Sequence, residues 1–209
     1  MLTVDLSLGV VVSNVPIYTI GYGNRSIEAF IRLLRQYEIQ FLIDVRSRPY
    51  SQFNAKFSKD ALERQLKEAS IRYVFMGDTL GGRPNDSTCY QDGNVAYAKV
   101  REKPFFQSGI ERIHTAWEKQ LRVALMCSEI KPQECHRSKL IGRTLTEQGI
   151  DVRHIDEAGL LKTQTDVNEL LVGSQSGNQP SLFDQETAVT SNEKLAFSRK
   201  KYSPSGERT

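Results

Sequence analysis

Residues 127–138 gather several side chains that can do chemistry. They include two thiols, an imidazole, a guanidinium and a carboxylate, in the order Cys127, Glu129, Cys135, His136 and Arg137. Thiolates act as nucleophiles or metal ligands, imidazole transfers protons, and guanidinium stabilises negative charge. Packing gives a surface loop no reason to collect such groups, so we predict a functional site in this stretch.

The two cysteines of this stretch admit three interpretations. In the first, Cys135 is a nucleophile, because a helix N-terminus and adjacent cationic groups favour its thiolate. In the second, Cys127, Cys135 and His136 bind a metal, with His154 or Glu129 as a further ligand. In the third, Cys127 is a small core residue and Cys135 holds the turn. The spacing of the cysteines is not a recognised zinc-finger spacing, so we rank the metal last and expect no cofactor.

Phosphatase and sulfurtransferase loops also place a cysteine between a strand and a helix. Their cysteine is followed within a few residues by a continuous anion cradle that ends in arginine. Here Pro132 and the ten-residue step from Cys127 to Arg137 break that pattern. We therefore exclude both classes.

An alternation of strands and helices should position these side chains. Apolar runs rich in β-branched and aromatic residues predict five buried strands, at Ile17–Ile20, Phe41–Val45, Ile71–Met76, Val123–Met126 and Val152–Ile155. Amphipathic segments predict helices over residues 26–37, 58–67, 95–103, 104–120 and 138–148, with Ser26 and Ser58 as caps. This alternation predicts a three-layer α/β domain with a mostly parallel sheet of about five strands.

The carboxyl ends of parallel strands meet at one edge of a sheet, where such domains bind ligands. The predicted substrate-binding residues at this edge are Asn24, Arg25, Arg46, Arg48, Gly82, Arg83 and His154. Arginine offers paired donors that match phosphate or carboxylate, and glycine allows close backbone approach. We predict a pocket for an anionic ligand, such as a phosphate or nucleotide. Any single arginine could instead form a structural ion pair with Asp44, Glu129 or Asp156.

The same edge supplies candidates for catalysis. Cys135 and His136 would carry the chemistry, with Glu129 and Asp44 as acid–base groups. Arg137 would stabilise charge that develops in the transition state. His154 follows the strand after that of His136 and could meet it.

Composition divides the chain into three parts. Residues 1–15 read as an N-terminal extension or an extra edge strand, and residues 16–172 form the α/β domain. Residues 173–209 are rich in Ser, Gly, Asn, Gln and charge and poor in aliphatic residues. Such a segment cannot bury enough apolar surface to offset its ordering entropy, so we predict a flexible tail.

Composition also limits the class of protein. Of 209 residues, 39% are apolar and 25% charged, as in soluble globular proteins, and a formal charge of +3 permits nucleic-acid contact without requiring it. Three irregularly spaced cysteines exclude a disulfide framework and favour the cytoplasm. The apolar start of the chain lacks the basic residues of a secretion signal and is too short to span a bilayer, so we expect no membrane association.

Five ordered motifs resemble the family called domain of unknown function 488. They are residues 17–26, residues 44–49, residues 80–83, residues 127–129 and residues 135–138. The resemblance covers about Ile17 to Ile155 and implies that these motifs form one constellation, without implying a reaction. One departure is Tyr22-Gly23, where a small polar pair such as His-Ser is expected.

A peptide in the predicted tail suggests a partner. Gln179-Pro180-Ser181-Leu182-Phe183 resembles the short peptides by which bacterial DNA-polymerase sliding clamps recruit repair and replication proteins. Leu182 and Phe183 would be the buried anchors and Gln179 the hydrogen-bonding end. The alternatives are a chance pentapeptide or a tail hook that docks on the domain itself.

These observations lead to three functional hypotheses. The first is an enzyme of DNA maintenance that acts on a phosphate-bearing substrate, either a nucleotide or a nucleic acid. The second is a non-catalytic nucleotide- or DNA-binding module recruited to the sliding clamp. The third is a metal-binding protein.

Overall fold

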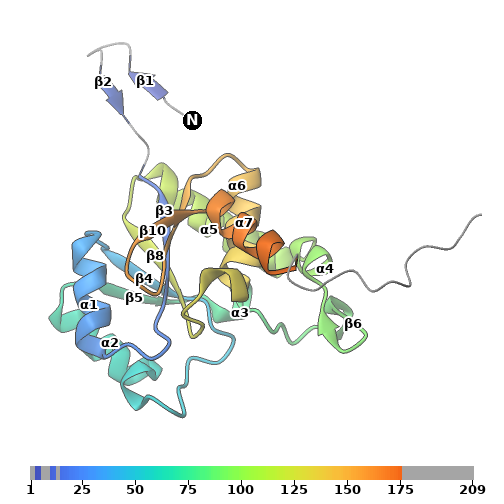
Figure 1. Cartoon of the computed structure of the whole chain (residues 1–209), viewed down its shortest axis with the longest axis horizontal. Helices are drawn as coiled ribbons and strands as arrows, with labels where there is room; N and C mark the ends of the chain where they lie inside the picture. The colour runs from blue at the N-terminus through green and yellow to red at the C-terminus, as the bar shows by residue number, and fades with distance from the viewer. Residues whose placement is uncertain (1–2, 6–9, 13–14, 176–209) are drawn as a thin grey trace, which may run out of the picture. The chain divides into compact units, whose positions relative to one another are not determined.

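The structure is a computed structural model that describes residues 3–5, 10–12 and 15–175. Its main sheet comprises β3 (Ile17–Gly21), β4 (Phe41–Asp44), β5 (Arg72–Phe75), β8 (Val123–Cys127), β9 (Val152–Ile155) and β10 (Leu161–Thr163). The strand order is β10-β9-β3-β8-β4-β5, and only β10 runs antiparallel to its neighbour (Figure 1). The predicted three-layer α/β domain with a mostly parallel sheet is confirmed.

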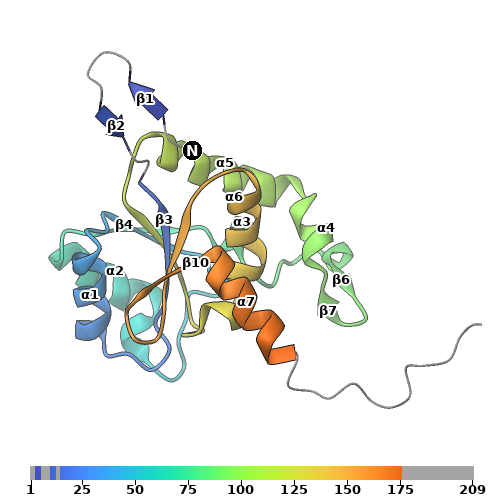
Figure 2. The same ribbon diagram turned by 45° about the horizontal axis from the view of Figure 1, so that its top comes forward.

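Helices cover both faces of this sheet (Figure 2). The helices are α1 (Ile27–Gln36), α2 (Lys59–Glu68), α3 (Gly77–Leu80), α4 (Tyr97–Arg101), α5 (Pro104–Glu118), α6 (Arg143–Glu147) and α7 (Gln164–Gln175). Short 3₁₀ turns lie at Ala55–Phe57, Ser87–Cys89 and Pro132–Glu134. One core packs against α1 and α2, and the other packs against α3, α4, α5 and α6.

Alternate side chains of each strand belong to the two cores, as the pleat of a strand requires. On β8, Val123, Leu125 and Cys127 face the core with α5, whereas Ala124 and Met126 face the core with α1. This alternation places the Cys127 thiol on the α5 side of the sheet, at the carboxyl end of its strand.

Local sequence signals explain where several helices begin. The Ser26 hydroxyl accepts a hydrogen bond from the Ala29 amide (3.1 Å) and caps α1, as predicted. Pro104 opens α5, where its missing N–H costs nothing. Ser58 occupies the N-cap position of α2, as predicted, but its hydroxyl accepts from the Ser51 amide (3.2 Å) and makes no capping hydrogen bond.

The helix predicted over residues 138–148 is present in two parts. Its first part, Arg137–Gly142, is a π-helix, and α6 continues from it. π-Helical turns are rare and often occur at functional sites. Gly149, with a φ of +82°, ends the helix in the left-handed region that glycine adopts without strain.

Several elements have no signal in the sequence pattern. β10 is a three-residue edge strand, and a small hairpin forms from β6 (Tyr90–Gln91) and β7 (Asn94–Val95). The segments β1 (Thr3–Asp5) and β2 (Val10–Val12) pair with each other, and the edges of the six-stranded sheet are β10 and β5. Helix α7 continues to Gln175, three residues beyond the boundary expected at residue 172.

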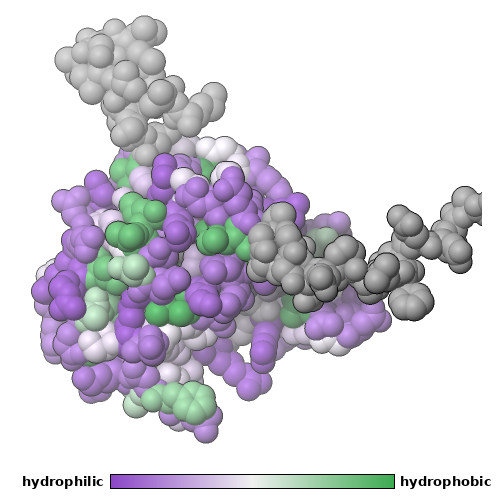
Figure 3. Space-filling model, viewed as in Figure 1, coloured by the Kyte–Doolittle hydropathy of each residue, from purple (hydrophilic) through white to green (hydrophobic). Residues whose placement is uncertain are grey.

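The face shown in Figure 3 is mostly hydrophilic, with apolar side chains scattered over it. Among the helices that the structure describes, none combines the length and the apolar character that crossing a bilayer requires.

Candidate functional site

A pocket of about 770 Å³ opens at the carboxyl ends of β3, β4 and β8. Parallel strands leave a ligand site at this edge of a sheet, so the pocket lies where the strand order predicts it. Its lining residues are Tyr22, Arg46, Ser47, Arg48, Tyr50, Phe75, Gly77, Asp78, Gly82, Arg83, Pro84, Asn85, Tyr90, Tyr97, Cys127, Ser128, Glu129, Glu134 and His136.

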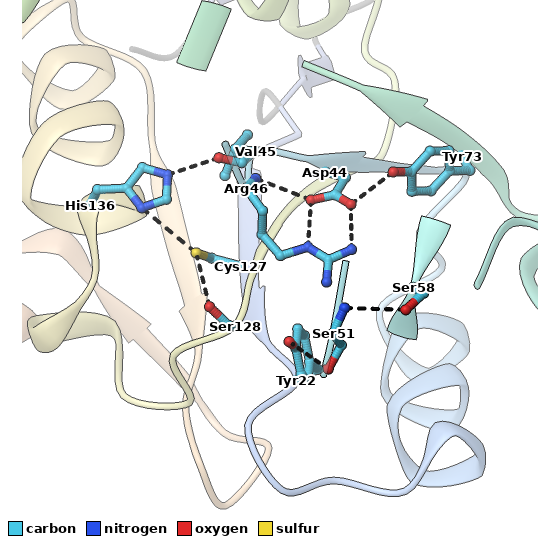
Figure 4. A network of polar contacts seen from close by, with 10 residues as sticks. All are labelled: Tyr22, Asp44, Val45, Arg46, Ser51, Ser58, Tyr73, Cys127, Ser128 and His136. Atoms are coloured by element: carbon cyan, nitrogen blue, oxygen red, sulfur yellow. Dashed lines mark hydrogen bonds and ion pairs between the residues drawn. The ribbon is translucent and has the colours of Figure 1, made fainter. Parts of the chain in front are cut away.

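Arg46 is fixed in the wall of this pocket by Asp44 (Figure 4). Its Nε and Nη2 donate to the two carboxylate oxygens of Asp44 at 2.9 and 2.6 Å. The Tyr73 hydroxyl and the Arg46 amide donate to the same carboxylate at 2.7 and 3.1 Å. Asp44 is fully buried and is not a lining residue. Its predicted acid–base role is therefore corrected to a positioning role, because its oxygens are all engaged.

The surroundings of Arg46 keep its guanidinium protonated. Burial alone would lower the pKa of Arg46, but the hydrogen bonds and negative charge of Asp44 raise that pKa overall. The Arg46 guanidinium also lies 5.3 Å from the centre of the Tyr22 ring, within cation–π range. Its remaining amino group, Nη1, is buried and has no hydrogen-bond partner in the described part of the chain.

Two further predicted residues, Arg48 and Arg83, line the pocket with exposed side chains. The Arg83 amide donates to the Ser47 hydroxyl (2.9 Å), which holds the backbone of residues 82–83 at the rim. Gly82 packs against His136, and a Cβ there would lie 2.7 Å from the imidazole Cγ. Only glycine permits this approach without displacing the ring.

Four side chains form a compact group at the side of the pocket, and we name Cys127, Glu129, Cys135 and His136 the Cys/His/Glu cluster. Their donor atoms all lie within 4.8 Å of one another. Glu129 Oε2 lies 2.7 Å from Cys127 Sγ and 3.1 Å from Cys135 Sγ. His136 Nδ1 lies 3.6 and 3.7 Å from the same two sulfur atoms. These donors are of the kinds that can share a proton or hold a metal ion.

The two cysteines differ in their access to the pocket. Cys127 lines it, together with Glu129 and His136, whereas Cys135 is buried and does not. The prediction that Cys135 is the nucleophile is therefore corrected, because a ligand in the pocket meets the Cys127 thiol instead. Sequence reasoning preferred Cys135 for its place at the helix start, but the alternation along β8 decides which sulfur faces the pocket.

The contacts within the cluster shift the pKa of each member. A hydrogen bond from Cys135, together with the hydrogen bond and charge of His136, lowers the pKa of Cys127 to about 5 against the effect of burial. Burial, followed by the Cys127 charge, raises the pKa of Cys135. Burial would raise the pKa of Glu129 and lower that of His136. Hydrogen bonds involving Cys127 reverse both effects, giving about 2 for Glu129 and a raised value for His136. The shifts therefore favour the thiolate at Cys127, the sulfur that faces the pocket, over a thiolate at Cys135.

Arg137 is fully buried and lies outside the pocket lining. Its Nη1 donates to the Glu129 carbonyl, and its Nη2 donates to the Ile130 carbonyl at 3.0 Å. The predicted role in stabilising a transition state is corrected: Arg137 holds the backbone that carries Glu129.

Arg25 has a comparable structural role. It donates to the backbone carbonyls of Gly21 (2.6 Å) and Asp156, and it does not line the pocket. Burial and the nearby Arg137 lower the pKa of Arg25. The exposed Asn24 beside it is likewise not a lining residue. The predicted substrate-binding roles of Arg25 and Asn24 are corrected.

His154 is fully buried between Thr19 and Gln164. Its Nδ1 lies 2.8 Å from the Thr19 hydroxyl, and its Nε2 lies 3.0 Å from Gln164 Oε1. Burial lowers the pKa of His154 to about 4, so the ring is neutral at physiological pH. His154 does not line the pocket, and its predicted part in substrate binding is corrected to a packing role.

Sequence reasoning missed the aromatic part of the pocket. Tyr22, Tyr50, Tyr90 and Tyr97 line it from four separate segments. No motif joins these tyrosines, and only the folded chain brings them together. The one sequence signal that pointed to Tyr22 was its departure from the His-Ser pair expected at residues 22–23. The Tyr22 ring stacks on Phe57, with ring centres 4.3 Å apart.

The proposed clamp-binding residues Gln179, Leu182 and Phe183 lie outside the described residues. Their role therefore stays a prediction.

Comparisons with known proteins give one match. The family model described as "Domain of unknown function DUF488" matches residues 26–144, which is more than half of the chain. Searches of curated proteins and of solved structures found no significant match.

Proposed function

Because the chain belongs to the DUF488 family, whose description assigns no activity, we propose a function from the pocket: an enzyme that acts on a phosphate-bearing substrate, either a nucleotide or a nucleic acid. Arg46, Arg48 and Arg83 would hold the phosphate. The Cys/His/Glu cluster would supply the reactive groups.

One observation carries this proposal, the joint placement of three arginines in the wall of one pocket. Arg46 is held rigid by Asp44 while its Nη1 has no hydrogen-bond partner in the described structure. Neither Arg48 nor Arg83 has an ion-pair partner among the described residues. Guanidinium groups without carboxylate partners favour an anionic ligand, and their fork suits phosphate oxygens.

Exposed aromatic side chains beside these arginines favour a nucleotide or nucleic acid over a simple anion. Tyr50 lines the pocket and is 72% exposed, and Phe53, three residues further along the same loop, is 99% exposed. Large exposed rings next to cationic groups are typical of surfaces on which nucleobases stack. The two rings support a substrate that carries bases as well as phosphate.

The Cys/His/Glu cluster supports an enzyme over a binding module. A pocket that only binds has no need for a thiol, a carboxylate and an imidazole within 4.8 Å of one another beside the ligand. The second candidate, a non-catalytic nucleotide- or DNA-binding module, depends on the same arginines and differs only in the purpose of this cluster.

A role in DNA maintenance in the cytoplasm rests on the tail peptide, Gln179 to Phe183. In this proposal Leu182 and Phe183 anchor the chain to the sliding clamp, and the domain reaches DNA from there. The test is a titration of the tail peptide against the clamp, compared with a peptide that carries Leu182→Ala and Phe183→Ala. Equal, negligible binding by both peptides would end this part of the proposal.

Ligand binding is tested by calorimetric titration of the full chain with inorganic phosphate, a nucleoside monophosphate and a short single-stranded oligonucleotide. Replacing Arg48 or Arg83 with Ala should weaken binding about 10- to 100-fold, the value of a charge-assisted hydrogen bond. Arg64→Ala on α2 is the matched control, because Arg64 is exposed but lies outside the pocket. Equal affinities for all three variants and the wild type would contradict the proposal.

Turnover separates the two candidate functions. The enzyme predicts that His136→Asn keeps ligand affinity and loses turnover on the nucleotide and oligonucleotide panel. If the wild type turns over nothing on the panel while it binds as tightly as His136→Asn, the binding module is favoured.

A further inference from the structure

We propose that the Cys/His/Glu cluster binds a zinc ion at the side of the pocket. The ligand atoms would be Cys127 Sγ, Cys135 Sγ, His136 Nδ1 and Glu129 Oε2. This inference concerns the chain's own donors and does not depend on the substrate proposed above. No recognised ligand spacing marks such a site in the sequence, because its ligands come from a strand end, a loop and a helix start.

The distances from the histidine nitrogen to the two sulfur atoms suit a tetrahedral site. Bonds of about 2.0–2.3 Å to zinc require ligand atoms about 3.3–3.8 Å apart. His136 Nδ1 lies 3.6 and 3.7 Å from the sulfur atoms of Cys127 and Cys135, within this range. Glu129 Oε2, at 2.7 and 3.1 Å from the same atoms, is closer. This carboxylate is on an exposed residue and needs to move away from the sulfur atoms by up to about 1 Å.

The orientation of His136 is the second, independent observation. Its Nε2 lies 3.0 Å from the Val45 carbonyl, which can only accept a hydrogen bond (Figure 4). Nε2 must therefore carry a proton, and in the neutral imidazole Nδ1 presents its lone pair to the two sulfur atoms. A backbone carbonyl on the far nitrogen is the usual partner of a metal-bound histidine, since it fixes both the tautomer and the ring.

Surrounding groups hold the other donors in place. The Arg137 amide donates to Cys135 Sγ at 3.5 Å, a contact that favours the thiolate. The Arg137 guanidinium binds the carbonyls of residues 129 and 130 and so fixes the loop that carries Glu129. Gly82 lies against the His136 ring, where any side chain would displace Nδ1. The buried arginine thus acts as a positioning residue.

The types of donor atom determine which metal ion the site prefers. Two thiolates and an imidazole suit zinc better than magnesium or calcium, which prefer oxygen. As the ion binds, any proton that either sulfur atom carries is released to solvent, and the ion is held by two thiolates, a neutral imidazole and a carboxylate. Cys127, Cys135 and His136 are buried, whereas Glu129 is exposed and faces the pocket. The fourth ligand is therefore the one that an anionic ligand in the pocket could displace.

The direct test is the metal content of the full chain, expressed without a metal-binding tag and purified without chelator. Elemental analysis should find about one zinc ion per chain. Cys127→Ala and Cys135→Ala should each lose most of it. The control is Cys89→Ala, because Cys89 is equally buried but is not in the cluster and should leave the metal content unchanged.

A second measurement keeps the test valid if the cysteine variants fail to fold. The wild-type chain, stripped with chelator under reducing conditions, is titrated with Co²⁺. A saturable thiolate-to-cobalt charge-transfer band, abolished by competing Zn²⁺, is expected. No zinc in the purified protein together with no such band would overturn the inference. Equal metal content in Cys127→Ala, Cys135→Ala and the wild type, or a Cys127–Cys135 disulfide in protein purified under reducing conditions, would also overturn it.

Failure of this inference and failure of the proposed function are distinguishable. Arg48→Ala and Arg83→Ala should keep the zinc, because neither residue is a ligand. A metal-free protein that still binds nucleotides through these arginines contradicts only the zinc site. A zinc-bound protein that binds no phosphate-bearing ligand contradicts only the proposed function.

Discussion

Two groups of arginines follow strands of the same sheet, and they differ in whether they line the pocket. Arg46, Arg48 and Arg83 line the pocket, whereas Arg25 and Arg137 donate to backbone carbonyls behind it. The difference lies in what surrounds each guanidinium. Backbone carbonyls engage Arg25 and Arg137. Asp44 engages Arg46, and Arg48 and Arg83 are exposed in the pocket. Residue type at a strand end therefore identifies an edge of the sheet, but not a role.

The buried group should control stability, and Arg137→Met should have the largest effect. The variant leaves the carbonyls of Glu129 and Ile130 without donors and removes a fully buried side chain. We expect a loss of about 3–5 kcal/mol in the free energy of unfolding, measured in urea. Arg83→Ala, in the group that lines the pocket, should change the free energy of unfolding by less than about 0.5 kcal/mol. Equal losses in the two variants would remove the distinction between the groups.

Asp44→Asn should have the second-largest effect on stability. It should also affect the pocket, because the buried Asp44 pairs with Arg46 in the pocket wall. The variant removes the charge that pairs with the buried Arg46 guanidinium. Breaking one side of a buried ion pair should cost about 3 kcal/mol of stability and weaken phosphate binding as Arg46 becomes mobile. Thermal unfolding and ligand titration measure the two effects. A variant as stable as the wild type would show that Asp44 does not hold Arg46.

The buried His154 should also make the stability of the fold depend on pH. Its pKa, about 4 in the folded chain, is below the unfolded value of about 6.5. The unfolded state therefore binds the proton first, and stability falls as pH decreases from about 6.5 to about 4, by at most about 3 kcal/mol. His154→Gln should flatten this part of the pH profile of unfolding. His114→Gln, at a histidine that is 40% exposed, should not. The same slope in both variants would assign the effect to other groups.

The smallest effect on stability is expected from Phe53→Ala, in the loop that follows Tyr50. Phe53 is 99% exposed, so its removal should change the free energy of unfolding by less than about 0.5 kcal/mol. If a nucleobase stacks on this ring, oligonucleotide affinity should fall about 5- to 100-fold while phosphate affinity stays the same. Parallel losses for oligonucleotide and phosphate would place Phe53 outside base recognition.

The architecture could be predicted from the sequence, because the spacing of apolar residues and the length of each apolar segment distinguish strands from helices. The apolar runs around Ile43 and Leu125 and the amphipathic segment around Phe30 specify strands and a helix without tertiary information. Edge elements such as β10 were missed because three residues paired on one side need no apolar run. The edge of the sheet at which the pocket opens was predictable from the parallel strand order alone.

Roles at the site were harder to predict because they depend on where a side chain points. The sequence favoured Cys135 over Cys127 as the nucleophile, and only the folded chain shows that Cys127 is the one that lines the pocket. Arg137 and Arg46 both follow a strand in the sequence, but carbonyls from residues 129 and 130 engage the first and a carboxylate engages the second. These partners lie at loop positions that no periodicity specifies.

The central claim, an anion pocket formed by one arginine group and not by the other, is tested most directly by crystallography with tungstate, a heavy analogue of phosphate. The account predicts an anomalous peak within hydrogen-bond distance of Arg46 Nη1 and of Arg48 or Arg83. A peak at Arg25 or Arg137 instead, or no peak in the pocket at saturating tungstate, would contradict it.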